Sequence, residues 1–202
     1  MHTGHLLVEN KKMAKSAGNF YKLKDIEEKY PGKEVLLSRG FRLMCLQNRY
    51  RENFNFTFDR LESAMVTIGN IDNFLKRLKS YKPHLHGKFR RNFRDYLQTA
   101  MQGFVSDIEN DIDTVHGVTY IFDLISEVNR AIDEQKLSDS EKNATIDILK
   151  SWDSVFGIID WSILEDAQIP ENILKLAEAR TAAKQTKNFQ EADEIRKKIE
   201  EF

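Results

Sequence analysis

Two lysines, Lys12 and Lys15, stand three positions apart in a polar segment near the start of the chain. Small residues lie beside them at Ala14 and Ser16, and Gly18 follows. Ammonium groups can oppose the negative charge that accumulates when a phosphate bond breaks, and small residues let backbone N–H groups approach phosphate oxygens. Lysine suits this task because it is a compact and mobile point charge. The pattern predicts a loop that closes on a polyphosphate, with a solvated basic loop as the alternative.

The residues around this segment predict the elements that must hold it. His5-Leu6-Leu7-Val8-Glu9 predicts a short strand, and residues 10–19 predict a polar loop. Beyond residue 21, apolar residues recur at steps of three and four over 61–78, 89–108 and 115–132, which indicates amphipathic helices. Ser138 and Glu141 have the spacing of a capping box and predict a fourth helix that ends near Gly157. A connector over 158–170 precedes two further helical stretches, at about 171–186 and 188–201.

Composition limits the class of protein. The chain has 202 residues, of which 41% are hydrophobic and 31% charged, and it holds only 9 Gly and 3 Pro. An all-β fold needs more turn residues than this, so the fold class we expect is mainly α. No segment reaches the ~18 consecutive apolar residues of a membrane span, and we expect no signal peptide and no membrane partner. One cysteine, Cys45, excludes a disulfide framework and a Cys-rich zinc site, and fits a reducing compartment such as the cytoplasm.

Charge is strongly polarised although the formal net charge is only -1. Residues 76–94 hold eight basic and no acidic residues, whereas residues 107–141 hold ten acidic residues and two basic ones. Cations among the aromatic residues Tyr81, Phe89 and Phe93 can contact RNA phosphates. Phe89 and Phe93 also lie on an apolar stripe, so we expect both in the core and the cations outside, facing either RNA or water. The acidic stretch should face away from RNA or pair with the basic segment. The candidate residues for binding RNA are Lys76, Arg77, Lys79, Lys88, Arg90, Arg91 and Arg94.

Other candidate sites are weaker. His2 and His5, with Glu9 and Cys45, make a poor zinc template because no second matched pair of ligands exists, and we assign no metal site. His116 is expected to cap or flank a helix. The two tryptophans, Trp152 and Trp161, are expected to pack against the connector rather than to stack on a nucleobase.

The segment Lys12-Met13-Ala14-Lys15-Ser16 resembles the KMSKS signature of class I aminoacyl-tRNA synthetases, and its surroundings resemble the cysteinyl-tRNA synthetase family. The resemblance extends over almost the whole chain. The matching segments are Met1–Leu6, Lys12–Phe20, Arg49-Tyr50-Arg51, Phe56-Thr57, Asn110–Thr114, Glu127-Val128-Asn129 and a hairpin from Ala179 to Arg196.

This resemblance implies a function for each part. Lys15 would contact ATP and Lys12 would assist at the phosphates, with Met13 and Ser16 completing the ATP-binding loop. ATP with magnesium and the cysteine tRNA would be the substrates. Residues 1–30 would end the catalytic domain, residues 31–160 would form an antiparallel, tRNA-binding helical bundle of the anticodon-binding type, and residues 161–202 would form a helical hairpin.

The chain also departs from the family pattern. Ala14 replaces the serine of KMSKS, and Val115 stands where the family has a proline. The HIGH signature and the zinc ligands belong to a catalytic half that would precede this chain, so zinc is expected only there. That half is an expected partner, and the chain alone is expected to be inactive. The alternatives are a non-catalytic RNA-binding or interaction module of a synthetase paralogue, and a helical bundle with no role in nucleic-acid binding.

Overall fold

The computed structural model describes residues 3–83 and 93–165, and farther on 175–176, 179–181, 183–184, 188 and 193–196. The chain divides into two compact units, Met1–Leu164 and Glu165–Phe202. In the second unit the described residues are helical except 165 and 188, and Ala183 and Ile195 are buried. Most of the predicted stretches 171–186 and 188–201 lies outside the described residues.

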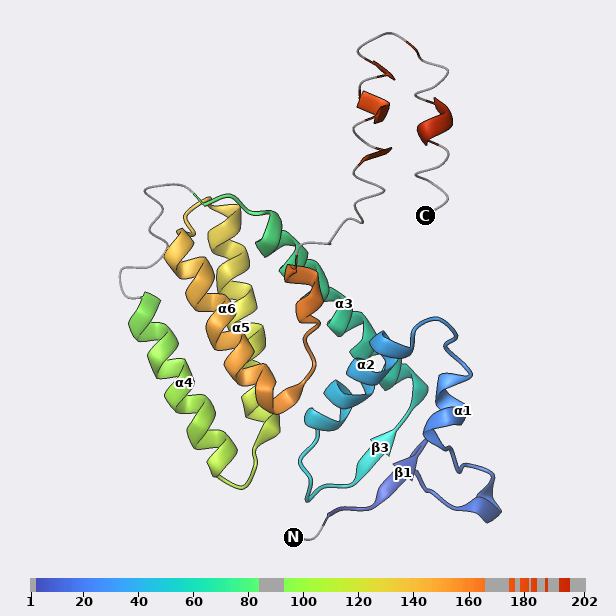
Figure 1. Cartoon of the computed structure of the whole chain (residues 1–202). Coiled ribbons are helices and arrows are strands. Elements are labelled where there is room, and N and C mark those ends of the chain that lie inside the picture. The colour runs from blue at the N-terminus through green and yellow to red at the C-terminus, as the bar shows by residue number, and fades with distance from the viewer. Residues whose placement is uncertain are drawn as a thin grey trace. The chain divides into compact units, whose positions relative to one another are not determined.

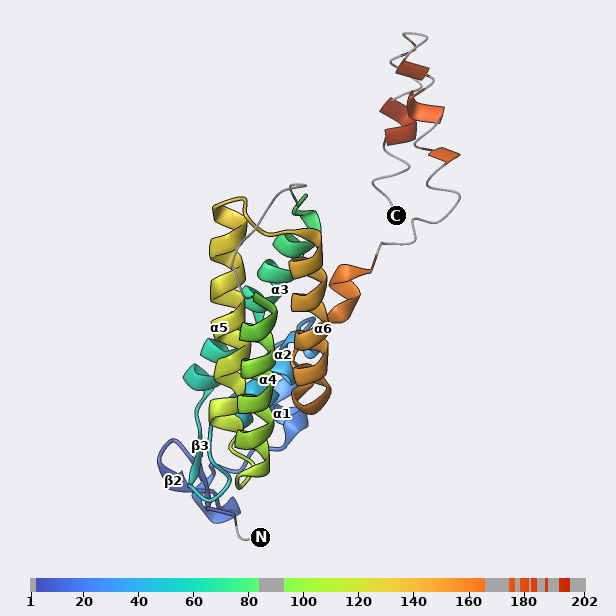
Figure 2. The ribbon, with the colours of Figure 1, turned by 90° about the vertical axis from the view of Figure 1, so that its left-hand side faces the viewer.

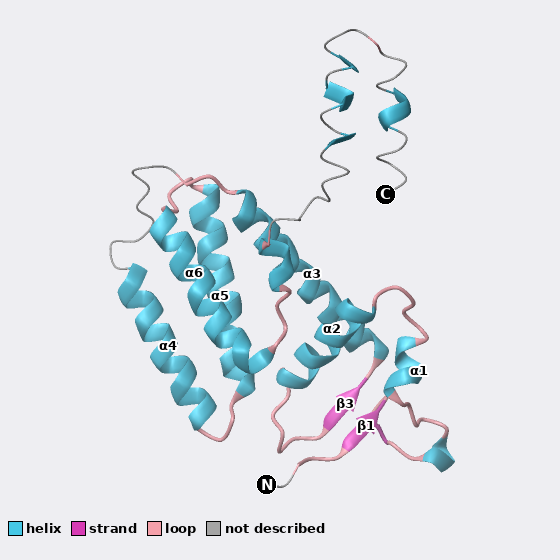
Figure 3. Ribbon diagram, in the orientation of Figure 1, coloured by secondary structure: helices cyan, strands magenta, loops and turns pink. Residues whose placement is uncertain are grey.

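A small sheet holds the N-terminal part of the first unit (Figure 3). Strand β1 (Leu6–Val8) lies between β2 (Lys11–Lys12), which is antiparallel to it, and β3 (Phe54–Phe56), which is parallel to it. The predicted strand at residues 5–9 is confirmed. The prediction of a continuous polar loop over 10–19 is wrong at its start, because Glu9 and Asn10 both adopt positive φ (50° and 62°), which closes a two-residue hairpin turn.

Helices build the rest of the first unit (Figure 1). The short α1 (Leu23–Glu27) leads into α2 (Glu34–Leu46), which packs on the long α3 (Phe58–Ser80). Helices α4 (Phe93–Glu109), α5 (Thr114–Asp133) and α6 (Asp139–Phe156) run side by side (Figure 2). The expected mainly α class is confirmed, as are the predicted helices over 61–78 and 115–132. The helix predicted over 89–108 is described from Phe93 onward.

The limits of α6 follow from two local signals. Ser138 accepts a hydrogen bond from the backbone N–H of Glu141 (3.3 Å), and the Glu141 carboxylate accepts one from the Ser138 N–H (2.9 Å). Gly157 ends the helix with φ 61°, a left-handed conformation that glycine adopts without a steric penalty. Both predictions from the capping box and from Gly157 are confirmed.

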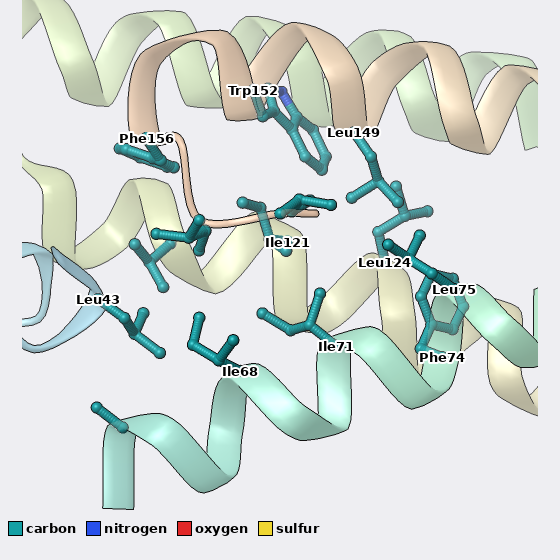
Figure 4. Packing of buried hydrophobic residues seen from close by; sticks show 14 of the residues in the cluster. Leu43, Ile68, Ile71, Phe74, Leu75, Ile121, Leu124, Leu149, Trp152 and Phe156 are labelled. Carbon is teal, nitrogen blue, oxygen red and sulfur yellow. The ribbon is translucent and has the colours of Figure 1, made fainter. Parts of the chain in front are cut away.

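The core is built where α2, α3, α5 and α6 meet (Figure 4). Leu43, Ile68, Ile121 and Leu149 are completely buried there, so burial of their apolar surface drives these helices together. Trp152 is also completely buried and stacks on Phe104 of α4 with ring centroids 5.7 Å apart. The ring of Trp152 therefore belongs to an aromatic cluster inside the bundle, and its packing on the connector stays a prediction.

The connector after α6 is tied back to the bundle. Asp153 accepts hydrogen bonds from the backbone N–H of Ile158 (2.7 Å) and from the indole N–H of Trp161 (2.9 Å), which lies in the 3-10 turn η2 (Trp161–Leu164). Trp161 is itself part of the connector and ties it to α6, whereas the sequence predicted that this ring packs against the connector. The buried Arg39 of α2 also donates to the carbonyl of Ile158 (2.8 Å) and pairs with Asp72 of α3 (2.5 Å). One cation therefore joins α2, α3 and the connector.

Candidate functional site

The lysine loop, residues 11–19, begins on the outer strand of the sheet. Lys12 ends β2 opposite Leu7 of β1, and the backbone N–H of Met13 donates to the carbonyl of Leu6 (3.3 Å). A 3-10 turn, η1 (Lys15–Ala17), follows, and its last N–H bond runs from Gly18 to the carbonyl of Lys15 (3.2 Å). Gly18 has φ 67°, so a side chain at this position would strain the backbone.

Asn19 holds the loop closed. Its side-chain oxygen accepts a hydrogen bond from the N–H of Ala14 (2.9 Å), and its amide group donates to the carbonyl of Lys12 (3.2 Å). One neutral side chain thus fixes the backbone between the two lysines. Sequence reasoning included Asn19 only as part of a motif. An Asn directly after a glycine in a polar loop was the available signal, because Asn side chains readily bond to nearby backbone groups.

The structure presents three of the four predicted ATP-binding side chains to solvent. Lys12, Lys15 and Ser16 are exposed, whereas Met13 is half-buried and packs against the core. The Lys15 ammonium lies 5.4 Å from the centroid of the Phe20 ring, a cation–π contact. The loop can therefore offer two ammonium groups and a hydroxyl to a ligand, while Met13 anchors it to the sheet.

The basic segment lies at the junction of α3 and α4. Lys76, Arg77 and Lys79 occupy the last turns of α3 and Arg94 the first turn of α4, and all but the half-buried Arg77 are exposed. Lys88, Arg90 and Arg91 lie outside the described residues. Phe93 is buried, as predicted; Phe89 is also outside the described part.

Arg77 shows how the acidic and basic stretches meet. Its guanidinium donates to the side-chain oxygen of Asn129 (3.0 Å) and pairs with the carboxylate of Asp133, both on α5. This confirms, for Arg77, the expectation that the two stretches pair. The ammonium of Lys142 on α6 lies nearby and donates to the carbonyls of Lys79 (3.3 Å) and Tyr81 (3.0 Å). Burial lowers the pKa of Lys142 below its usual value of 10.5, against an opposing contribution from Asp139.

The remaining candidates have structural positions. His116 lies in the first turn of α5, where its backbone N–H donates to the capping carboxylate of Asp113 (3.2 Å), so it flanks a helix as predicted. The described residues contain no group of three or more His, Cys, Asp or Glu side chains arranged to hold a metal ion. None of the helices in the described part combines the length and the apolar character needed to cross a bilayer.

Comparison with known proteins agrees with this arrangement. Residues 1–66, which carry the sheet, the lysine loop and the start of α3, match the family model of the class I (C) tRNA synthetase catalytic domain. Residues 103–160, which span most of the α4–α6 bundle, match the DALR domain model. The lysine loop on its sheet, followed by this bundle, is thus the construction of a class I tRNA synthetase.

Sequence comparison with individual relatives identifies the family within the class I tRNA synthetases. The chain is 30% identical over 200 residues to the cysteine–tRNA ligase of Chlamydia caviae, covering 98% of this chain and 40% of that protein. It is 33% identical over 211 residues to the ligase of Chlamydia muridarum and 32% identical over 205 residues to that of Caldicellulosiruptor saccharolyticus, covering 98% of this chain and 42% of each relative. The chain belongs to the cysteinyl-tRNA synthetase family and spans about two fifths of the length of these relatives, in their C-terminal part.

Proposed function

We propose that this chain supplies the ATP-phosphate loop and the tRNA-binding helices of a cysteine–tRNA ligase. In this reaction the carboxylate of cysteine attacks the α-phosphate of ATP and releases pyrophosphate, after which the cysteinyl group passes to the 3′ end of its tRNA. The observation that carries the proposal is the lysine loop, in which Asn19 bonds to the backbone at Lys12 and Ala14 and leaves Lys12 and Lys15 exposed.

The loop acts by position and charge and forms no covalent bond. As pyrophosphate leaves, negative charge grows on its oxygens, and the ammonium groups of Lys12 and Lys15 stabilise that charge. Lys15 rests over the Phe20 ring, a contact worth about 0.5–1 kcal/mol at an exposed site. An interaction of this size is close to thermal energy, so it only favours this position of the ammonium and is readily exchanged for a phosphate.

The loop itself does not fit a metal ion. Residues 10–19 contain no Asp or Glu, and the loop offers ammonium groups, a hydroxyl and backbone N–H groups, which suit phosphate oxygens rather than a hard cation. Magnesium would therefore arrive on the phosphates of ATP itself. We place any zinc site in the part of the ligase that lies outside this chain.

The cations at the α3–α4 junction are proposed to contact the phosphates of the cysteine tRNA. Lys76 and Lys79 at the end of α3 and Arg94 at the start of α4 are exposed, and the sequence between the two helices adds four more cations. A cluster of cations attracts a nucleic acid through its phosphates, whatever the base sequence of that nucleic acid. Arg77 contributes less to this surface, since Asp133 and Asn129 already hold its guanidinium.

Cysteine-dependent ATP–pyrophosphate exchange tests the proposal in the ligase completed with its upstream part. Replacing Lys12 and Lys15 together by alanine should lower the exchange rate by about 100-fold or more, because the stabilising charges on the leaving group are lost. Lys11→Ala is the matched control, since Lys11 is an exposed lysine on the same strand. If the double variant retains the exchange rate of the parent, the proposed role of the loop is wrong.

The same assay on the 202-residue chain alone should show no exchange. Cysteine-dependent exchange by this chain would contradict the proposal that it supplies only part of the site. If the completed protein binds cysteine tRNA but shows no exchange, the chain is instead the non-catalytic RNA-binding module of a paralogue.

A further inference from the structure

Two turns that are distant in sequence meet beside the sheet. The turn between α2 and β3 carries Arg49, Tyr50 and Arg51, and it faces the turn between α4 and α5, which carries Asp111 and Asp113; both turns lie at the lower end of the molecule in Figure 1. Arg51 pairs with Asp111 (Nη2 to Oδ1, 2.6 Å), and the hydroxyl of Tyr50 donates to the same carboxylate oxygen. Arg51 also donates from Nε to the Tyr50 hydroxyl oxygen (2.9 Å). Arg49 pairs with Asp113 (3.3 Å), so the two turns share a network of charge-assisted hydrogen bonds.

The first of these turns also holds the strand that leads into the lysine loop. The carbonyl of Tyr50 accepts a hydrogen bond from the N–H of Gly4 (3.0 Å), and the side chain of Asn53 accepts one from His5 (2.9 Å). The Phe54 N–H then donates to the carbonyl of His5 (2.9 Å), after which β1 and β3 continue in register. Tyr50 therefore binds α5 through its side chain and the lysine-loop strand through its backbone.

The approach of Gly4 to this turn leaves no room for a side chain. A Cβ atom at Gly4 would lie 2.0 Å from the carbonyl oxygen of Glu52, far inside van der Waals contact. A displacement of the turn must therefore displace the strand with it, because close-packed backbone transmits movement.

The second turn adopts a backbone conformation that neighbouring groups must hold. Asp111 and Ile112 have φ of 64° and 56°, in the left-handed region, which is unfavourable for a β-branched residue such as Ile112. Thr114 fixes the far side of the turn by donating to the carbonyl of Leu46 at the end of α2 (2.8 Å). The contacts from Tyr50 and Arg51 hold the near side, so this turn has two defined neighbours and little freedom between them.

We propose that Tyr50, Arg51 and Asp111 are positioning residues that couple the N-terminus of α5 to the lysine loop. When tRNA binds the helical bundle, the turn at residues 111–113 sets the position of Tyr50, whose backbone sets β1 and hence the hairpin that carries Lys12 and Lys15. This inference rests on the proposed function, because it assigns the coupling to the ATP-phosphate loop of a ligase.

Charge reversal and its rescue test the coupling in this chain without any activity. Arg51→Asp and Asp111→Arg, made singly, should each raise the amide exchange rates of Gly4, Phe54 and Met13 by about fivefold or more, because the network no longer holds the turn. The two changes together recreate an ion pair of opposite direction and should return these rates to those of the parent. Tyr50→Phe, which removes one hydroxyl, is the milder variant and should shift the same amides in the same direction.

Lys136→Glu with Glu134→Lys provides the matched control. This ion pair is exposed, as the network is, and its Lys136 Nζ lies 2.8 Å from Glu134 Oε2. It lies just after α5, at the opposite end of that helix from Asp111. Its reversal should leave the strand amides unchanged. If the network variants leave exchange at Gly4, Phe54 and Met13 unchanged, or if the charge swap is as disruptive as the single reversals, the coupling is wrong.

Kinetics of the completed ligase separate this inference from the proposed function. Arg51→Asp should lower kcat of pyrophosphate exchange by about tenfold with the KM for ATP within about twofold, since a misplaced loop loses stabilisation of the transition state rather than binding of the ground state. The charge swap should restore kcat. If Lys15→Ala abolishes exchange while Arg51→Asp changes neither kcat nor amide exchange, the coupling fails and the function stands. If Lys15→Ala has no effect, the proposed function fails, and amide exchange alone decides the coupling.

Discussion

Asn19 carries no charge, yet its amide bonds to the backbone at Ala14 and at Lys12 and so shapes the segment between the two lysines. At the scale of single residues, a functional loop depends on such neutral contacts as much as on the groups that meet the ligand. The lysines supply charge, and Asn19 and Gly18 decide where that charge is held. A site that is correctly charged but loosely held loses much of its effect, because stabilisation of a transition state requires groups in fixed positions.

Removing the Asn19 side chain should therefore impair the reaction more than the fold. For Asn19→Ala we expect cysteine-dependent pyrophosphate exchange to fall by about tenfold, because the loop backbone loses the bonds that close it. The unfolding midpoint should change little, since most residues of the loop are exposed. Asn70→Ala, an exposed asparagine on α3, is the control and should leave the exchange rate unchanged. An Asn19→Ala enzyme as active as the parent would contradict the role given to this side chain.

The ionisation of Asp111 predicts how the stability of the fold depends on pH. The hydrogen bond from Tyr50 lowers the pKa of Asp111 most, and Arg51 lowers it further against an opposing contribution from desolvation. A carboxyl group whose pKa is lower in the folded state than its ordinary 3.8 stabilises the fold above 3.8, and that stabilisation is lost as the pH falls through the folded-state pKa.

Urea unfolding of the parent and of Asp111→Asn between pH 7 and pH 2.5 measures this contribution. The parent should be the more stable of the two at neutral pH, and the difference in unfolding free energy should shrink as the pH falls below 3.8. A difference that stays constant down to the lowest pH would mean that ionisation of Asp111 is irrelevant to its contacts.

At the scale of elements, Arg39 shows how packing of helices creates a binding position for a charge. Its guanidinium lies between α2 and α3, where it pairs with Asp72 (2.5 Å) and donates to the carbonyl of Ile158 in the connector (2.8 Å). The side chains of Arg39 and Asp72 are only 10% and 18% exposed, so loss of one partner leaves the other charge poorly solvated.

We expect Arg39→Ala to destabilise the fold by about 3 kcal/mol, toward the lower end for a buried pair because Asp72 keeps some contact with water. Lys136→Ala, which removes an exposed ion pair with Glu134, should change stability by less than about 0.5 kcal/mol. Chemical denaturation monitored by tryptophan fluorescence compares the two. Equal losses in both variants would show that burial does not distinguish these pairs.

Two glycines in these elements differ in whether the structure leaves room for a side chain. A Cβ atom at Gly69, inside α3, would meet nothing within 4 Å, whereas one at Gly4 would collide with the backbone at Glu52. Gly69→Ala should therefore stabilise the fold by up to about 1 kcal/mol, the difference in helix propensity. Gly4→Ala should displace the lysine-loop strand and destabilise the fold. Denaturation midpoints that shift in the same direction for both variants would contradict this contrast.

For the molecule as a whole, the arrangement of charge matters more than the near-zero total. Lys76 and Lys79 are exposed at the end of α3 and Arg94 at the start of α4, and the carboxylate of Asp133 pairs with Arg77 there. We propose that the exposed cations there form a surface for a polyanion. The lysine loop lies at the other end of α3, near its first residues.

Reversing charge on this surface should weaken tRNA binding in a way that salt reveals. For Lys76→Glu with Lys79→Glu, affinity for cysteine tRNA should fall, and the slope of log K against log salt concentration should become shallower by about 1–2, since about 0.9 counterions are released per phosphate contact. Lys24→Glu, on the exposed side of α1, serves as the control. An unchanged affinity and slope in the double variant would remove the α3–α4 junction from the tRNA-binding surface.

The sequence by itself determined those features that have a local cause. The helices over 61–78 and 115–132 follow from apolar periodicity, the limits of α6 follow from the Ser138–Glu141 box and Gly157, and the lysine loop follows from residue type and spacing. Only the tertiary structure decided the rest. Strand β3 is three residues long, too short for any periodicity, and its partner β1 lies 48 residues earlier in the chain. The contact of Arg51 with Asp111 joins positions 60 residues apart, and such contacts depend on how the helices pack rather than on local preference.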